Sequence, residues 1–377
     1  MRYIDEFRNG TVAKVLAHKI AEAASSHQHY KLMEFCGGHT HAIYRYGIPS
    51  LLPKNVEMIH GPGCPVCVLP IGKIDQAIAL AQQPNVIFCS YADMLRVPGT
   101  NRMTLLKAKA QGADIRMIYS AEDALNIARH HPDKQIIFFA IGFETTTPPT
   151  AIALQVAKRE QLQNFSVFCN HVLTPVAMAG ILTPAADGQI AELDGFVGPS
   201  HVSIIIGSNA YDKVAQQFHK PIVISGFEPL DVLQSILMLI DMINAHEVGV
   251  KNQYTRAVTA EGNIIAQQAI ADTLELRDQF EWRGLGSIPK SALKINAQYS
   301  DFDAEQKFPI VTGVGQEHKA CDCPAILRGL KKPADCKLFA TACTPENPLG
   351  SCMVSSEGAC AAYYAYGRTA QSEKVMS

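Results

Sequence analysis

The stretch IIFFAIGFETTTPPT, residues 136–150, joins an apolar run to a Thr- and Pro-rich turn and then to a helical pattern over Thr150–Glu160. A short run of β-branched and aromatic residues predicts a buried strand, and a helix directly after it is typical of parallel α/β layers. Ligands of such folds lie at the strand ends. Glu144 and Thr145 are therefore candidate site residues, although Thr145 could instead cap the next helix with Glu144 as a first-turn acid.

The same alternation runs through most of the chain and predicts the α/β class. The expected strands are Val56–Ile59, Val86–Cys89, Ile115–Tyr119, Ile136–Ile141, Ser166–Cys169, Val202–Ile206 and Ile222–Ser225. The expected helices are Thr11–Ala24, Ile71–Ala81, Met103–Gln111, Ala121–His130, Thr150–Glu160 and Asp231–Ala245.

Two short echoes suggest an internal duplication, although chance recurrence in buried strands would also produce them. Asn85–Cys89 resembles Phe165–Cys169, and IGFE at 141–144 recurs as SGFE at 225–228. We expect two similar, Rossmann-like parallel α/β domains, residues 30–143 and 144–230. A third, helical and loop-rich domain would comprise residues 1–29 and 231–377.

Composition excludes several classes of function. The 377 residues are 47% apolar and 18% charged, and the net charge of −2 gives no general attraction for nucleic acid or anionic membranes. No signal-peptide pattern and no apolar run of membrane-spanning length is found, so we expect a cytoplasmic protein. In that reducing compartment, an odd number of unevenly clustered cysteines favours metal ligands or redox thiols over structural disulfides.

Six of the eleven cysteines lie near the C-terminus, among prolines and glycines: Cys321, Cys323, Cys336, Cys343, Cys352 and Cys360. Thiolates on irregular backbone commonly hold an iron–sulfur cluster or a structural zinc. A cubane needs four ligands, and Cys323, Cys336, Cys343 and Cys360 are the favoured set. Cys321 and Cys352 would be a spare pair able to form a disulfide, and spacing alone leaves the choice of four open.

Cysteine and histidine recur in a second motif, Cys36-Gly37-Gly38-His39-Thr40-His41. A thiol and two imidazoles on a Gly-Gly turn suit iron, zinc or copper, and the glycines leave room for ligands that the protein does not supply. The turn could also simply end a strand before a helix cap.

The third motif is a Cys-x-x-Cys turn, Gly61-Pro62-Gly63-Cys64-Pro65-Val66-Cys67. A thiol near a helix start is commonly acidified, which favours reversible disulfide formation by Cys64 and Cys67. Half of a zinc site shared with Cys36 is the alternative. His201, in Gly198–Ser203, would by itself more often be a core histidine than a ligand. Cys89 and Cys169 end predicted strands and should be inert.

Taken together, these motifs resemble the HypD family of nickel–iron hydrogenase maturation factors across nearly the whole chain. The resemblance implies two related α/β domains and a third with a [4Fe–4S] cluster. It also implies a complex with the small chaperone HypC, in which iron acquires cyanide and carbon monoxide. HypE would donate the cyanide, and the Fe(CN)2CO unit would pass to the hydrogenase large subunit.

The resemblance also implies roles for individual residues. Cys36 would be the iron ligand, with His39 as a further ligand or as a donor behind it. Cys64 and Cys67 would exchange electrons with the cluster. The cleft between the domains would be lined by Glu144, Thr145 and His201.

Two classes of function follow. The first is an assembly scaffold with redox activity, rather than a conventional turnover enzyme. The second is a freestanding iron–sulfur thiol oxidoreductase resembling ferredoxin:thioredoxin reductase, in which Cys36 has no assigned role.

Overall fold

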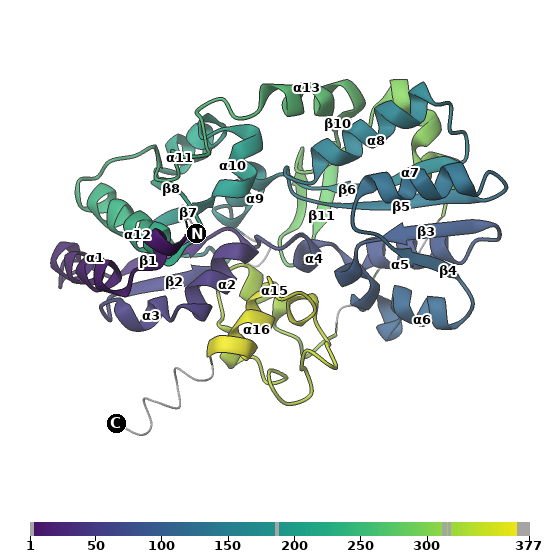
Figure 1. The fold of residues 1–377 in the computed structure, drawn as a ribbon. Coiled ribbons are helices and arrows are strands. Elements are labelled where there is room, and N and C mark those ends of the chain that lie inside the picture. The colour runs from purple at the N-terminus through teal and green to yellow at the C-terminus, as the bar shows by residue number, and fades with distance from the viewer. Residues whose placement is uncertain (1–3, 185–187, 311–314, 316–317, 368–377) are drawn as a thin grey trace.

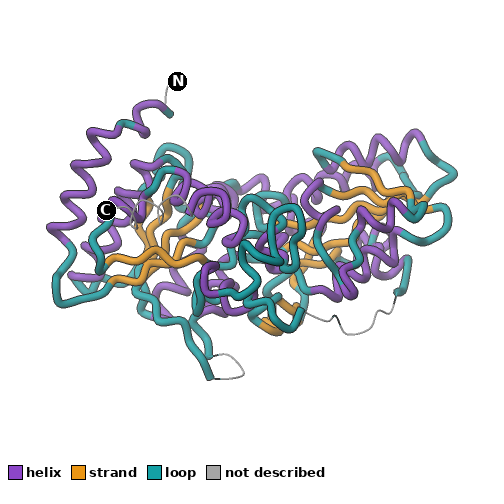
Figure 2. Tube along the Cα trace, turned by 90° about the horizontal axis from the view of Figure 1, so that it is seen from below, coloured by secondary structure: helices purple, strands orange, loops and turns teal. Residues whose placement is uncertain are grey.

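Two parallel sheets occupy opposite ends of the protein, and the cysteine-rich C-terminal segment lies between them on one side (Figures 1 and 2). The computed structural model describes residues 4–184, 188–310, 315 and 318–367. Sheet A has the strand order β2-β1-β7-β8-β9, and sheet B has the order β4-β3-β5-β6.

The strands of sheet A come from two distant parts of the chain. They are β1 (Tyr30–Glu34), β2 (Val56–His60), β7 (Gly195–Pro199), β8 (Ile222–Ser225) and β9 (Val250–Asn252). Sheet B is formed by the intervening part, with β3 (Val86–Ser90), β4 (Asp114–Met117), β5 (Gln135–Gly142) and β6 (Phe165–His171). Two antiparallel pairs follow, β10 (Leu274–Leu276) with β13 (Leu293–Ile295), and β11 (Gln279–Trp282) with β12 (Gly286–Pro289).

Within each sheet the first four strands along the chain are arranged in the same way. The first strand of each sheet, β1 or β3, lies between its second and third strands, and the fourth follows the third. This is the doubly wound order with a reversal beside the first strand, where α/β proteins bind ligands. The α/β class is therefore confirmed, with two sheets of Rossmann-like topology.

Helices cover both faces of the sheets, as the continuous apolar runs of strands such as β5 require. In β5, Phe138 packs toward α7 and α8, whereas Phe139 packs in the core that includes α5 and α6. The helices are α1 (Gly10–Ala23), α2 (Gly37–Arg45), α3 (Ile48–Leu51), α4 (Pro65–Val68), α5 (Ile71–Ala81), α6 (Leu105–Ala110), α7 (Ala121–His130), α8 (Thr147–Arg159), α9 (Thr174–Ile181), α10 (Ser200–Ile206), α11 (Asp212–Phe218), α12 (Pro229–Asn244), α13 (Ile264–Thr273), α14 (Ala304–Lys307), α15 (Cys323–Leu327) and α16 (Ala359–Ala362). None of the helices in the described ranges is both long and apolar enough to cross a membrane.

One expected strand is wrong. Residues 202–206 belong to helix α10, and the strand precedes it as β7. The Ser203 hydroxyl donates to the carbonyl oxygen of Pro199, four residues earlier, as in a helical turn. A short apolar run does not distinguish a helix from a strand by its periodicity, and the Gly- and Pro-containing β7 carries a weak strand signal.

The expected boundary at residue 143 does not separate the two sheets. β1 and β2 precede it yet join sheet A, and β6 follows it yet joins sheet B. The first echo relates β3 and β6, which are non-equivalent strands of one sheet, so it does not mark a duplication. The sheets resemble each other in topology rather than in these short sequences.

The N-terminal helix lies against sheet A rather than with the cysteine-rich segment. Ile20 of α1 packs with Leu233 and Ile236 of α12 and with Val223 of β8 in one buried cluster. The placement of residues 1–29 and of α12 with a third domain is therefore not supported by the packing. An amphipathic helix buries its apolar face against the nearest apolar surface, and here α12 supplies it.

Candidate functional site

Cys36 and His201 meet at the strand-order reversal of sheet A. Cys36 follows β1 and is the N-cap residue of α2, whereas His201 follows β7 and lies in the first turn of α10. β1 and β7 are parallel neighbours, with Met33 opposite Phe196, so their carboxyl ends bring both residues to one edge. The fold thus places a thiol and an imidazole where ligands usually bind.

The Cys36 sulfur lies 3.3 Å from Nδ1 of His201. Burial, and then the nearby Glu357 carboxylate, raise the pKa of the Cys36 thiol well above its usual value. Burial lowers the pKa of His201 to about 4, so the imidazole is neutral at neutral pH. A neutral imidazole keeps one free ring nitrogen, so it and the thiolate that forms when the thiol loses its proton are two possible donors for a metal.

A pocket of about 320 Å³ opens over this pair. Its walls are formed by Arg8, Cys36, Gly38, His41, Ala42, Arg45, Tyr46, His201, Phe227, Glu228 and Glu357. A Cβ atom on Gly38 would lie only 2.9 Å from the Phe227 ring, so the glycine allows this helix start to approach the aromatic wall.

His39 lies behind the pocket rather than in its wall. Its Nε2 is 3.1 Å from the Ser225 carbonyl oxygen and 3.0 Å from that of Gly226, so Nε2 carries the proton and donates. The buried Nδ1 has no hydrogen-bond partner among the described residues. Its ring packs on Phe227 with 4.6 Å between centroids, which supports the pocket wall.

Glu34, which the sequence analysis missed, anchors Cys36. The Cys36 N–H donates to Glu34 Oε2 at 2.9 Å, and the hydroxyl of Thr40 donates to Oε1. Oε1 also lies 2.7 Å from Nδ1 of His60. The available signal was a glutamate at the end of a mostly apolar segment, because a buried carboxylate requires several partners. Glu357, also missed, is preceded by no recognisable motif.

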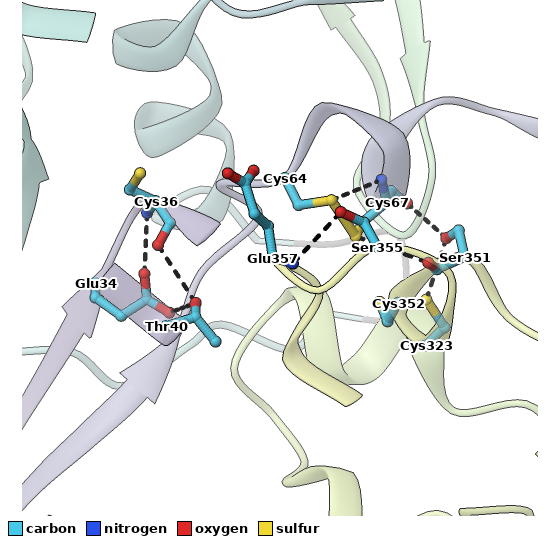
Figure 3. The surroundings of a disulfide bond; sticks show 10 residues. All are labelled: Glu34, Cys36, Thr40, Cys64, Cys67, Cys323, Ser351, Cys352, Ser355 and Glu357. Carbon is cyan, nitrogen blue, oxygen red and sulfur yellow. Dashed lines mark hydrogen bonds between the residues drawn. A yellow bond between two sulfur atoms is a disulfide. The ribbon is translucent and has the colours of Figure 1, made fainter. Parts of the chain in front are cut away.

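Cys64 and Cys67 form a disulfide next to this site. Cys64 is the N-cap residue of α4 and Cys67 lies within its single turn, and their Cα atoms are 5.2 Å apart. A Cβ atom on Gly63 would lie less than 3.0 Å from the main chain of Cys36, so the two cysteine motifs are in direct contact. Figure 3 shows Glu357 between Cys36 and the disulfide.

All six C-terminal cysteines line one pocket, together with apolar side chains that include Ile326, Leu338, Phe339 and Met353. Sγ of Cys323 lies 2.7 Å from Sγ of Cys352. The Cys321 thiol also contacts Cys323 and is the largest cause of the lowered pKa of Cys323, followed by Cys352. Cys323, an expected ligand, therefore lies against both members of the expected spare pair.

This donor set fits an iron–sulfur cluster. Soft sulfur donors in an apolar surround are the usual environment of such clusters. In the part of the chain that the structure describes, no group of three or more His, Cys, Asp or Glu side chains is arranged to hold a metal ion, so the fit rests on the kind of donor atoms and their surroundings. Six sulfurs around one pocket suit a multi-iron cluster better than a compact tetrahedral zinc site.

Glu144 and Thr145 do not line the pocket that contains Cys36. The Glu144 carboxylate accepts hydrogen bonds from the N–H and the hydroxyl of Thr174, both at 2.8 Å, at the start of α9. Burial raises the pKa of Glu144 to about 7. The carboxylate thus holds the first turn of a neighbouring helix, and its expected role in a cleft between the domains stays a prediction.

The fold and the site define a class: an α/β protein with a thiol–imidazole pair, a Cys-x-x-Cys disulfide and a pocket of six cysteines. A family model described as "HypD: Hydrogenase formation hypA family" matches residues 11–367. The chain belongs to this family.

Curated relatives match this chain over nearly their whole length. The chain is 60% identical to the hydrogenase maturation factor HypD of Azotobacter vinelandii, over 98% of both chains. It is 58% identical to HypD of Cupriavidus necator, over 98% of both chains. Identity with HypD of Escherichia coli is 47%, covering 97% of this chain and 98% of that protein.

Proposed function

We propose that this protein is a hydrogenase maturation factor, a scaffold on which the Fe(CN)2CO unit of nickel–iron hydrogenases is assembled. The observation that carries the proposal is the Cys36–His201 pair, 3.3 Å apart beneath a pocket at the strand-order reversal. Family membership supplies the pathway. The iron unit is the cargo of this site rather than a resident cofactor.

The protein residues prepare a soft ligand for iron. The Cys36 thiol would release its proton to solvent as iron binds, because only the thiolate is a metal ligand, and the neutral His201 imidazole lies beside it. Backbone N–H groups of Gly38 and His39 donate to that sulfur and oppose the effect of burial on its pKa. Glu34 fixes the Cys36 main chain, so the sulfur keeps its direction.

The disulfide and the cysteine pocket have redox roles in this proposal. Cys323, Cys336, Cys343 and Cys360 would hold a [4Fe–4S] cluster, with Cys321 and Cys352 as the spare pair. When bound, such a cluster supplies electrons one at a time. Cys64 and Cys67 take up two electrons and two protons when their disulfide opens. Their contact with the Cys36 motif supports a role close to the iron.

Partners follow from the family and from the open pocket. A HypC-like small chaperone would cover the Cys36 pocket, and a HypE-like protein would deliver cyanide there. The hydrogenase large subunit would receive the finished unit indirectly. The reducing cytoplasm is the proposed compartment, because it keeps such thiols available.

Infrared spectroscopy of the protein co-expressed with its small partner tests the scaffold. We expect bands of metal-bound cyanide and carbon monoxide in the wild type and their complete loss in Cys36→Ala. Cys89→Ala is the control, since Cys89 is buried within sheet B. Bands that persist in Cys36→Ala would contradict the assignment.

A freestanding thiol oxidoreductase is the second candidate, favoured by the disulfide next to the cysteine pocket. It predicts that Cys36→Ala still reduces protein disulfides at the wild-type rate. Cluster iron without cyanide or carbon monoxide bands in the wild type would favour this candidate over the scaffold.

A further inference from the structure

Ser351 contacts both the redox turn and the cysteine pocket. It is fully buried in the short turn Ser351–Met353, and its hydroxyl donates to the carbonyl oxygen of Cys67 at 2.9 Å. The hydroxyl oxygen of Ser351 also lies 3.6 Å from Sγ of Cys323. Sγ of Cys67 lies 3.9 Å from the carbonyl oxygen of Ser351. Figure 3 shows Ser351 between Cys67 and Cys323.

A second contact holds the next carbonyl of the same turn. The N–H of Arg283 donates to the carbonyl oxygen of Val68 at 2.8 Å. The following residue, Gly284, packs against Pro324, where an added Cβ atom would lie 2.8 Å from Cα. Pro324 adjoins Cys323, so this contact also comes from the side of the cysteine pocket.

These two bonds matter because α4 is a single turn. Its terminal carbonyl groups have no later helical N–H group to accept from, and buried carbonyls need partners. Both partners here belong to segments that form or touch the cysteine pocket. Two hydrogen bonds therefore tie the turn of Cys67 to the segments beside Cys323, and of these two the Ser351 bond is the one that involves a side chain.

We propose that Ser351 is the positioning residue that holds the Cys64–Cys67 turn against the cysteine pocket for electron exchange. The proposal rests on the redox part of the proposed function. Opening the disulfide breaks one S–S bond, consumes two electrons and two protons, and yields two thiols. In the test the electrons come from dithionite, and the protons come from solvent.

The first experiment measures the turn without any cluster. Amide hydrogen exchange of the turn at residues 64–69 is followed in the metal-free, full-length protein. We expect faster exchange in Ser351→Ala, because the Cys67 carbonyl loses its partner. Ser235→Ala is the matched control: Ser235 is equally buried, and its hydroxyl donates to the Asp231 carbonyl oxygen at 2.8 Å within α12. Unchanged exchange in Ser351→Ala would overturn the proposal.

The second experiment measures electron exchange in the cluster-loaded protein. Dithionite is added, and free Cys64 and Cys67 thiols are counted by alkylation and mass spectrometry. We expect Ser351→Ala to be reduced about tenfold more slowly, since small displacements between reacting groups cost large factors in rate. Reduction by dithiothreitol in the metal-free protein should not slow.

The outcomes separate this proposal from the function on which it rests. A wild-type rate in Ser351→Ala, or an equal slowing with dithiothreitol, would overturn a positioning role. If the cluster does not accelerate reduction of the wild-type disulfide, the redox function itself fails, and electron exchange fails with it. Hydrogen exchange would still decide whether Ser351 holds the turn.

Discussion

The first four strands of sheets A and B have the same order, but the ends of the strands at the two reversals are lined by different side chains. In sheet A, Cys36 and Gly38 leave a space of about 320 Å³. At the matching place in sheet B, Phe143 directly follows β5, and its ring lies 6.1 Å from that of Trp282. Aromatic side chains occupy this place in sheet B, whereas Gly38 leaves space at the matching place in sheet A. One topology thus offers two crevices, and side-chain volume decides which can bind a ligand.

The two sheets also use a buried glutamate differently. Glu34 ends β1 and accepts the N–H of Cys36, a residue of the pocket. Glu144 lies just after β5 and accepts from Thr174, at the start of a neighbouring helix. Both carboxylates organise the backbone beyond a strand end, but only Glu34 does so for a reactive group.

The largest expected effect comes from emptying the filled crevice. Phe143→Ala should lower the free energy of unfolding by about 4 kcal/mol, because a buried aromatic ring is lost and a cavity remains. Phe227→Ala, at the half-buried wall of the open pocket, should cost about 1 kcal/mol. Urea unfolding followed by circular dichroism measures both. Equal losses of unfolding free energy in the two variants would contradict the view that one crevice is filled and the other open.

The contact between the two cysteine motifs of sheet A can be broken by one methyl group. Gly63→Ala would place a Cβ atom against the Cys36 main chain, and we expect a loss of about 3 kcal/mol in unfolding free energy. Gly72→Ala in α5 is the control, since its Cβ atom would meet nothing within 4 Å. It should be neutral or stabilise by about 0.5 kcal/mol. A tolerated Gly63→Ala would show that this contact is adaptable.

A smaller effect is expected for Glu144, the buried glutamate of sheet B, whose contribution to the free energy of unfolding should depend on pH. The pKa of Glu144 is about 7 when folded and 4.5 in its ordinary range, so the folded state retains a proton that the unfolded chain loses. Its contribution to stability is complete below pH 4.5 and is lost as pH rises through 7. Glu144→Gln should therefore gain about 2 to 3 kcal/mol relative to wild type between pH 4.5 and 8.

Urea unfolding at both pH values measures this gain. Glu160→Gln serves as the control, because the hydrogen bond from Arg129 lowers the pKa of Glu160. Its relative stability should fall, rather than rise, with pH. A pH-independent difference for Glu144→Gln would show that this carboxyl has an ordinary pKa.

Local elements were predicted well where the pattern was strong. The expected helices at 71–81 and 121–130 match α5 and α7, and the expected strand at 222–225 matches β8. β1 and β7 were missed. Lys31 and Glu34 interrupt the apolar pattern of the first, and glycine and proline weaken that of the second. These two strands carry the site, so the most important pairing had the weakest local signal.

The sequence by itself determined the chemistry and the kinds of element: the soft donors Cys36, Cys64 and Cys67, the C-terminal cysteines, and the alternation of strand and helix. Only the tertiary structure decided that β1 pairs with β7, that Cys36 meets His201 and that Ser351 contacts both Cys67 and Cys323. The apolar period of a segment shows which of its own faces is buried. A parallel sheet instead joins segments that lie far apart along the chain, so the local pattern of one strand does not identify the strand with which it pairs.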